Sequence, residues 1–371
     1  MSLFSDQKSP KVLIESWSPV CDIQAFAEES QSCVYFYLWI NPGKENPQVR
    51  GCWVCNTRPA PEALDKAAMD RGEAPMMPAG QCRHDLGGIR LRREELSIVW
   101  LEEGDAAALL EGDRILALIP GWAGQGGCHG YARYAAGTGS LAWELAQAEA
   151  ALAPRVARSR AYWERMAGES GGYWPELQEK GLGAMEAFFG PHEKYYAIDG
   201  GQFPAKALVT GRRAGRRYAF TLGVSALCQP AVEQFWQDEA SQHRRIELGF
   251  AAGEDLPEEA WMGMLNWLSA QSGLPWRYLS WLGHGHTIPC NRLPGFEAVL
   301  FVDPRELAGV EGPELPPVMG EPVSLLWAVP LTPEEYYFAR TAESSTTLLS
   351  RCRGGAEELP VFTGEGKFLL G

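Results

Sequence analysis

Long apolar runs are missing from this 371-residue sequence, and the start of a secretory signal is missing too. No stretch approaches about 20 uninterrupted apolar residues, the length that a membrane-spanning helix needs. The opening residues, MSLFSDQKSPKVLIESW, carry no apolar segment after their lysines, as a secretory signal would. We therefore expect a soluble, cytoplasmic protein with no membrane partner.

Basic residues are scarce relative to acidic ones. The sequence has 33 Lys and Arg against 47 Asp and Glu, a net charge of −14, and the acidic excess is larger in residues 175–371 than in residues 1–174. Binding to nucleic acid relies on clustered Lys and Arg that neutralise phosphates. The composition therefore argues against a nucleic-acid partner and favours a basic protein or peptide.

The nine cysteines do not suggest a disulfide framework, because their number is odd and no secretory signal precedes them. Cys52 and Cys55 have the spacing of zinc ligands. Two further pairs could complete such a site: Cys82 with His84, or Cys128 with His129. A zinc knuckle usually repeats the tight spacing, and this sequence does not. We interpret Cys52 and Cys55 as thiols of a half-buried strand and expect no cofactor.

Three further segments suggest a catalytic serine, a phosphate-binding loop and a metal site, but each lacks the sequence context that its chemistry requires. GESGG (168–172) places Ser170 in a G-x-S-x-G motif, yet a predicted helix precedes it where a strand should. The glycine-rich segment 121–139 has neither G-x-G-x-x-G nor G-K-[ST]. The carboxylates of 102–113 lack the spacing of a calcium loop, so a solvated acidic hairpin or short helical connection is expected. These segments predict no enzyme.

The length predicts two domains, with the boundary at GESGG, so that residues 1–170 form an amino-terminal domain and residues 175–371 a second one. Aromatic and branched residues predict strands, and periodic patterns predict helices. In the first half the expected strands are 33–40, 51–56, 96–103 and 114–122, and the helices are 60–72 and 140–166, the latter broken or kinked at Pro154. In the second half the expected helices are 175–190, 256–273 and 332–340, and the strands are a hairpin within 205–227, 244–252, 295–304 and 322–330. The fold class is α+β.

The stretch WLGHGHTIPC (281–290) brings His284, His286 and Cys290 close together in the sequence. In a strand, the two imidazoles would point to the same face and could approach one metal ion. Glycine alternating with histidine instead describes a turn or a strand end. A metal-dependent hydrolase built on His284 and His286 therefore remains the alternative to a structural role.

Seven segments in one order then resemble the suppressor of fused family, over about residues 177 to 353. They are YAFTLGVSAL, RRIELGF, AWMGMLNWLSAQ, GHTIPCN, FEAVLFVDP, VSLLWAVPLTPEEYYFA and TTLLSRC. The resemblance implies a mixed sheet with flanking helices that binds proteins without catalysis. Eukaryotic members clamp an extended peptide of a transcription factor, and bacterial members are often considered immunity proteins that neutralise toxins. His286 matches a histidine of the family, whereas Gly285 stands where eukaryotic members carry an acidic residue.

A binding site is therefore expected around the turn after the helix 256–273. Exposed aromatic side chains dominate protein interfaces because they bury a large area at low conformational cost. We predict contacts from Trp276, Tyr278, Trp281 and His286, with Glu247 as an acidic contact. The expected function is a non-catalytic protein-binding module, such as an immunity protein that masks a basic toxin or a protein that sequesters a peptide of its partner.

Overall fold

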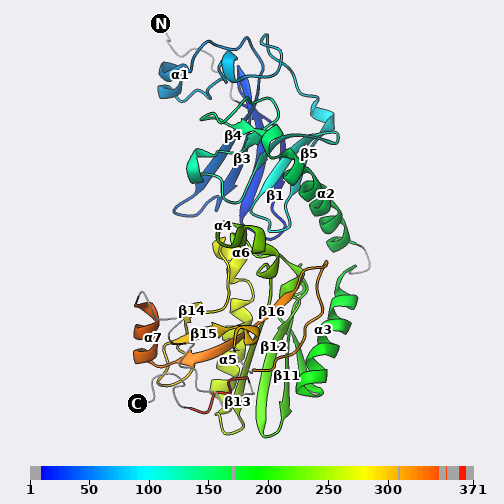
Figure 1. Cartoon of the computed structure of the whole chain (residues 1–371), viewed down its shortest axis with the longest axis vertical. Helices are drawn as coiled ribbons and strands as arrows, with labels where there is room; N and C mark the ends of the chain where they lie inside the picture. Colours follow the sequence, from blue (N-terminus) through cyan, green and yellow to red (C-terminus); the bar gives the residue numbers. More distant parts are fainter. Residues whose placement is uncertain (1–9, 169–171, 308–309, 342–347, 349–358, 365–371) are drawn as a thin grey trace. The chain divides into compact units, whose positions relative to one another are not determined.

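A computed structural model of the chain describes residues 10–168, 172–307, 310–341, 348 and 359–364. The chain folds as two compact units, Met1–Met166 and Ala167–Gly371, and each contains both strands and helices (Figure 1). The predicted α+β class is confirmed. No helix in the described ranges is long and apolar enough to cross a membrane.

Two sheets form the first unit. The first sheet is an antiparallel meander of β1 (Lys11–Trp17), β2 (Ile23–Glu29), β3 (Cys33–Ile40) and β4 (Gln48–Asn56). The second sheet contains, in order, β5 (Leu96–Trp100), β6 (Ala107–Glu111), β7 (Arg114–Ile119), β8 (Tyr131–Ala132) and β9 (Trp143–Glu144). The expected strand 33–40 is confirmed to the residue, because an unbroken aromatic and branched run ends there at a turn.

The helices of this unit are α1 (Lys66–Asp70) and α2 (Glu149–Met166). We expected Pro154 to break or kink a helix over residues 140–166. The helix does not break there, because it begins later than the sequence suggested. The helix begins only at Glu149, so Pro154 lies within its second turn, and residues 143–144 belong to β9 instead. A proline this close to a helix start removes few backbone hydrogen bonds, which is why the helix continues through it.

The acidic segment 102–113 is not the solvated connection that we expected. It contains the buried strand β6, whose neighbours β5 and β7 cover both of its edges. Glu111 is 5% exposed and pairs with Arg114, and Glu103 is 4% exposed and pairs with Arg155 Nη2 at 2.9 Å. These carboxylates are buried because arginines neutralise them, and only Asp113 is fully solvated.

A seven-stranded mixed sheet forms the centre of the second unit. Its strands, in order, are β10 (His192–Ala197), β11 (Ala207–Arg213), β12 (Arg216–Leu222), β13 (Arg245–Gly253), β16 (Val323–Leu331), β15 (Ala298–Val302) and β14 (Thr287–Pro289). The pair β13–β16 is parallel and the other pairs are antiparallel. β10 and β14 are therefore the two edges.

Helices cover both faces of this sheet, as expected. On one face α3 (Trp174–Phe189) buries Met185 and Phe189, and the Phe189 ring stacks on Trp327 at 5.7 Å. On the other face lies α5 (Glu258–Gln271), whose Trp261 stacks on Phe250 at 5.9 Å. The shorter helices are α4 (Val232–Trp236), α6 (Leu274–Tyr278) and α7 (Pro333–Arg340). The central strands are buried on both faces, which explains their nearly continuous apolar sequences.

Two local predictions in this unit are confirmed by their hydrogen bonds. The basic hairpin turns at Ala214 and Gly215, both with positive φ, between paired Arg213 and Arg216. α7 begins with the expected capping box, in which Thr332 and Glu335 bond each other's backbone N–H groups. Two other segments lie outside the described residues: Ser170 of GESGG, and most of TTLLSRC.

Candidate functional site

One end of the second sheet gathers the segments that follow β12, precede β13 and precede β14. The side chain of Gln229, fully buried, holds them together. Its Oε1 accepts a hydrogen bond from Leu282 N–H at 2.8 Å, and its Nε2 donates to the carbonyls of Leu282 and His243, each at 3.0 Å. A buried amide with these partners fixes the three segments relative to one another.

An aromatic cluster lies on this framework. The Trp281 ring is 5.7 Å from Phe235, 5.8 Å from Trp236 and 4.3 Å from His286, measured between centroids. Trp236 in turn stacks on His243 at 3.6 Å. We call these five residues the aromatic cluster. It joins α4 to the segment before β14, two parts of the chain about 50 residues apart in sequence.

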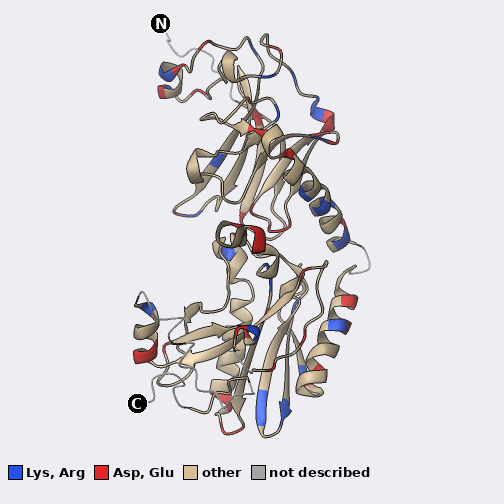
Figure 2. Cartoon of the chain, in the orientation of Figure 1, with Lys and Arg blue, Asp and Glu red and all other residues tan. Residues whose placement is uncertain are grey.

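The aromatic cluster is partly open to solvent and has acidic neighbours. Phe235 is 65% exposed, an unusual state for a phenylalanine in contact with other rings. Asp238 and Glu239 follow it in a 3₁₀ helix, both are exposed, and the described residues offer neither an ion-pair partner. Figure 2 shows acidic residues on and beside α4. Exposed aromatics with unpaired carboxylates suit a partner that is both apolar and basic.

The expected exposure is wrong for Trp276 and correct for Tyr278. Trp276 is 4% exposed and its Nε1 donates to the carbonyl of Cys228 at 2.9 Å, whereas Tyr278 is 67% exposed. Both residues lie on α6, where two positions are about 200° apart around the axis, so only one of them can face solvent. Trp281 and His286 are half-buried within the aromatic cluster.

The expectation that Glu247 is an exposed acidic contact is also wrong. It lies in the central strand β13, is 2% exposed, and points at the end of β12. Its Oε1 accepts bonds from Gly223 N–H, Ser225 N–H and the Ser225 hydroxyl, and its Oε2 accepts from the Thr221 hydroxyl at 2.7 Å. Burial raises the pKa of Glu247 to about 6, although these four donors oppose the rise. Glu247 is thus a structural anchor for the turn 223–225.

Gly285 shapes the backbone between the two histidines. It has φ 84°, its N–H donates to Phe301 C=O, and Phe301 N–H donates to His286 C=O, each at 2.8 Å. Two residues thus oppose one, which is a β-bulge with glycine in the left-handed position. A bulge re-aims the next side chain, and here it directs His286 toward Trp281.

The histidines are arranged as neutral structural groups. His284 Nδ1 accepts a hydrogen bond from Asp303 N–H at 3.0 Å, which places the proton of the neutral ring on Nε2 and leaves no free lone pair for a metal. Burial lowers the pKa of both His284 and His286. Among the described residues, His284 and His286 belong to no group of three metal-ligating side chains. The arrangement favours the turn interpretation of WLGHGHTIPC.

The edge strand β14 has few backbone N–H and C=O groups that point away from the sheet. Ile288 is paired with Val299 of β15, and the backbone hydrogen bonds on both sides of Ile288 point toward β15. In an antiparallel strand the alternate residues Thr287 and Pro289 then direct their backbone groups outward. Pro289 has no N–H, and its carbonyl accepts from Trp267 Nε1 at 3.2 Å. Thr287 therefore presents an outward N–H and C=O to an incoming strand.

Sequence reasoning missed Gln229, Phe235, Trp236 and His243. The adjacent pair Phe235–Trp236 within the polar segment AVEQFWQDEASQ was the available signal, because large aromatics in such a segment need a partner. No sequence signal identified Gln229, because its hydrogen bonds join segments that come together only in the folded chain.

Cys52 and Cys55, the other candidate metal ligands, lie in β4 and are fully buried. Burial raises the pKa of both thiols, which disfavours the thiolate that zinc binds. The part of the expected strand from Cys52 to Asn56 is buried rather than half-buried.

Comparison with known proteins agrees with the resemblance seen in the sequence. Residues 204–359 match the family model for suppressor of fused protein (SUFU). One similar solved structure is "the Sufu-Fu complex crystal structure", with 14% sequence identity, a TM-score of 0.33, and coverage of 48% of this chain and 84% of that chain. No curated protein matches this chain. The resemblance is therefore confirmed for residues 204–359, which are similar to the suppressor of fused family model.

Proposed function

We propose that this chain is a non-catalytic protein-binding module that captures a basic segment of a partner at the aromatic cluster and edge strand β14. The partner segment would lie extended, pair its backbone with Thr287, and place an apolar side chain against Phe235 and Trp281. Backbone pairing at a sheet edge supplies affinity and side-chain contacts supply specificity, so no catalytic group is needed.

The observation that carries the proposal is the exposed Phe235 packed on Trp281 beside the unpaired carboxylates of Asp238 and Glu239. β14 alone would bind weakly, because it is three residues long and contains a proline, features that protect edge strands from pairing. The aromatic cluster must therefore supply most of the binding free energy. The net charge of −14 would steer a cationic partner toward the chain.

We further propose that the partner is a basic toxin and that the chain acts as its immunity protein in the cytoplasm. The family resemblance and the acidic charge motivate this assignment. Co-expression with the toxin-like product of a neighbouring gene tests it. The wild-type chain should restore growth, and Phe235→Ala combined with Tyr278→Ala should not. The exposed Tyr337, on α7, supplies the matched control Tyr337→Ala.

A metal-dependent hydrolase at His284 and His286 makes the opposite prediction. Elemental analysis of protein purified without a histidine tag distinguishes the two functions. Stoichiometric zinc that is lost in His284→Ala would contradict the non-catalytic proposal.

A further inference from the structure

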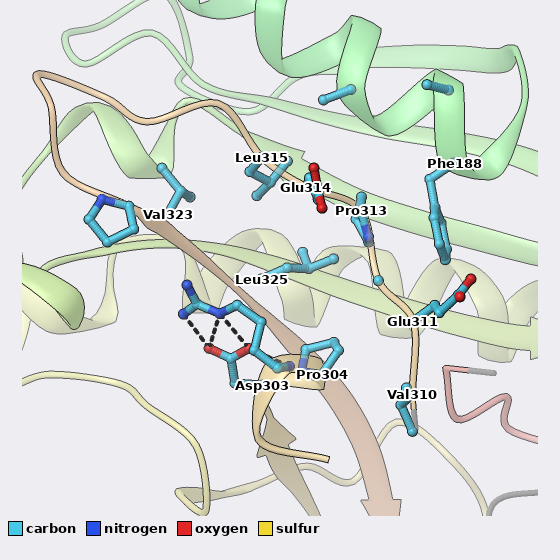
Figure 3. A pocket seen from close by; sticks show the side chains of 15 residues that line it. Phe188, Asp303, Pro304, Val310, Glu311, Pro313, Glu314, Leu315, Val323 and Leu325 are labelled. Atoms are coloured by element: carbon cyan, nitrogen blue, oxygen red, sulfur yellow. Dashed lines mark hydrogen bonds and ion pairs between the residues drawn. The ribbon is translucent and has the colours of Figure 1, made fainter. Parts of the chain in front are cut away.

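A second surface of the same unit has the shape of a binding pocket. It has a volume of about 810 Å³ and lies between α3, the segment 310–315 and the start of β16. Figure 3 shows Phe188 reaching from α3 toward this segment, with Leu325 on β16 forming the opposite wall. Volumes of about 300–1,000 Å³ are typical of pockets that bind small molecules or anchor side chains.

The walls of the pocket are mostly apolar. Ala187 and Phe188 contribute from α3, Val310 and Leu315 from the irregular segment, and Leu325 from β16. Leu315 and Val310 also pack against the core of the sheet, which ties the segment to the rest of the unit. Pro322 also lines the pocket, and the preceding residue, Glu321, pairs with the fully buried Arg245 at 2.9 Å. The pocket therefore has an anchored frame.

The charges around the pocket are unbalanced. Arg305 is neutralised by Asp303, because its Nη2 lies 2.6 Å from Asp303 Oδ2 and its Nε donates to both carboxylate oxygens, as the dashed lines in Figure 3 show. Glu311 and Glu314 are exposed, and within the described ranges neither has an ion-pair partner. Two carboxylates thus remain uncompensated on an apolar pocket.

We propose that this pocket binds a short basic peptide segment, with an aliphatic side chain between Ala187, Phe188 and Leu325 and flanking Lys or Arg side chains at Glu311 and Glu314. This site goes beyond the capture proposed at the aromatic cluster and does not depend on it. Asp303 links the pocket to the segment before β14, because its N–H donates to His284 Nδ1 and its side chain holds Arg305.

Methyl-detected NMR of the full chain tests the pocket directly. The probe is acetyl-Arg-Leu-Arg-amide, and the reporters are the methyl groups of Val310, Leu315 and Val323. The peptide should shift these signals saturably, whereas acetyl-Glu-Leu-Glu-amide should not. No shift at millimolar peptide, or equal shifts with the acidic peptide, would overturn the proposal.

Two variants with matched controls sharpen the test. Ala187→Trp should fill the pocket and abolish the shifts, while Glu179→Trp, at an exposed α3 position outside the pocket, should not. Glu311→Gln with Glu314→Gln should weaken peptide binding about tenfold, and Glu179→Gln with Glu334→Gln should leave it unchanged. Binding that survives Ala187→Trp would place the peptide elsewhere and contradict the assignment. Because no natural partner is needed, failure here leaves the capture proposal intact.

Discussion

The rings of Trp281 and His286 lie 4.3 Å apart, with an interplanar angle of 59°, although four residues and a β-bulge separate them in the chain. The contact depends on Gly285, whose φ of 84° turns the backbone so that His286 faces back toward Trp281. Gly283 contributes as well, since a Cβ there would collide with the Trp281 ring. Gly285 is thus explained by its backbone conformation and Gly283 by its packing on Trp281.

Substitution of Gly285 should reveal the left-handed backbone. Gly285→Val should lower the free energy of unfolding by about 2 kcal/mol, because a branched residue strains this region, and Gly285→Asn should cost less than about 1 kcal/mol, because asparagine tolerates it. Chemical denaturation of both variants measures the difference. Equal costs for the two substitutions would argue against the bulge.

Trp276 and Tyr278 should respond oppositely to truncation. Trp276→Ala should lower the free energy of unfolding by about 3–5 kcal/mol, because it leaves a cavity and removes the hydrogen bond to the Cys228 carbonyl. Tyr278→Ala should change it by less than about 0.5 kcal/mol, as is usual for exposed positions. Thermal and chemical denaturation measure both values. A strong destabilisation by Tyr278→Ala would remove it from the binding surface.

Glu247 should make stability depend on pH. Its pKa is raised from about 4.5 when unfolded to about 6 when folded, so the folded chain holds the proton more tightly. The free energy of unfolding should therefore fall, by about 2 kcal/mol, as the pH rises through this window from 4.5 to 6.

Glu247→Gln is the reference variant for this measurement. A glutamine can keep its oxygen at the Gly223 and Ser225 donors and direct its amide to Thr221 Oγ1. The unfolding free energy of the wild type minus that of the variant should decrease as the pH rises from 4.5 to 6. A difference that grows with pH would mean that the four hydrogen bonds outweigh desolvation.

Limited proteolysis tests the predicted domain boundary near residues 167–176. Cleavage should occur there before it occurs within 221–227, where Thr221, Val224, Ser225 and Ala226 are buried. Mass spectrometry of the first fragments locates the cut. An earlier cut inside 221–227 would mean that the domain boundary is misplaced.

The sequence predicted those elements whose signals are local. α7 was identifiable from Thr332, Pro333 and Glu335 alone, and β3 from its aromatic run. β6 was missed because its acidic neighbours suggested a solvated segment. One of these neighbours, Glu103, is buried in an ion pair with Arg155, which is distant in the sequence. The same holds for the candidate site. The sequence nominated both Trp276 and Tyr278, but which of the two faces solvent depends on how α6 packs.

The most direct test of the account is the affinity of the full chain for the partner that it captures, measured by calorimetry at low salt. Phe235→Ala combined with Tyr278→Ala should weaken binding at least about tenfold while the free energy of unfolding stays within about 1 kcal/mol of wild type. Tyr337→Ala, which removes an aromatic side chain that is 75% exposed on α7, should leave the affinity unchanged. Equal affinities for wild type and the double variant would contradict capture at the aromatic cluster.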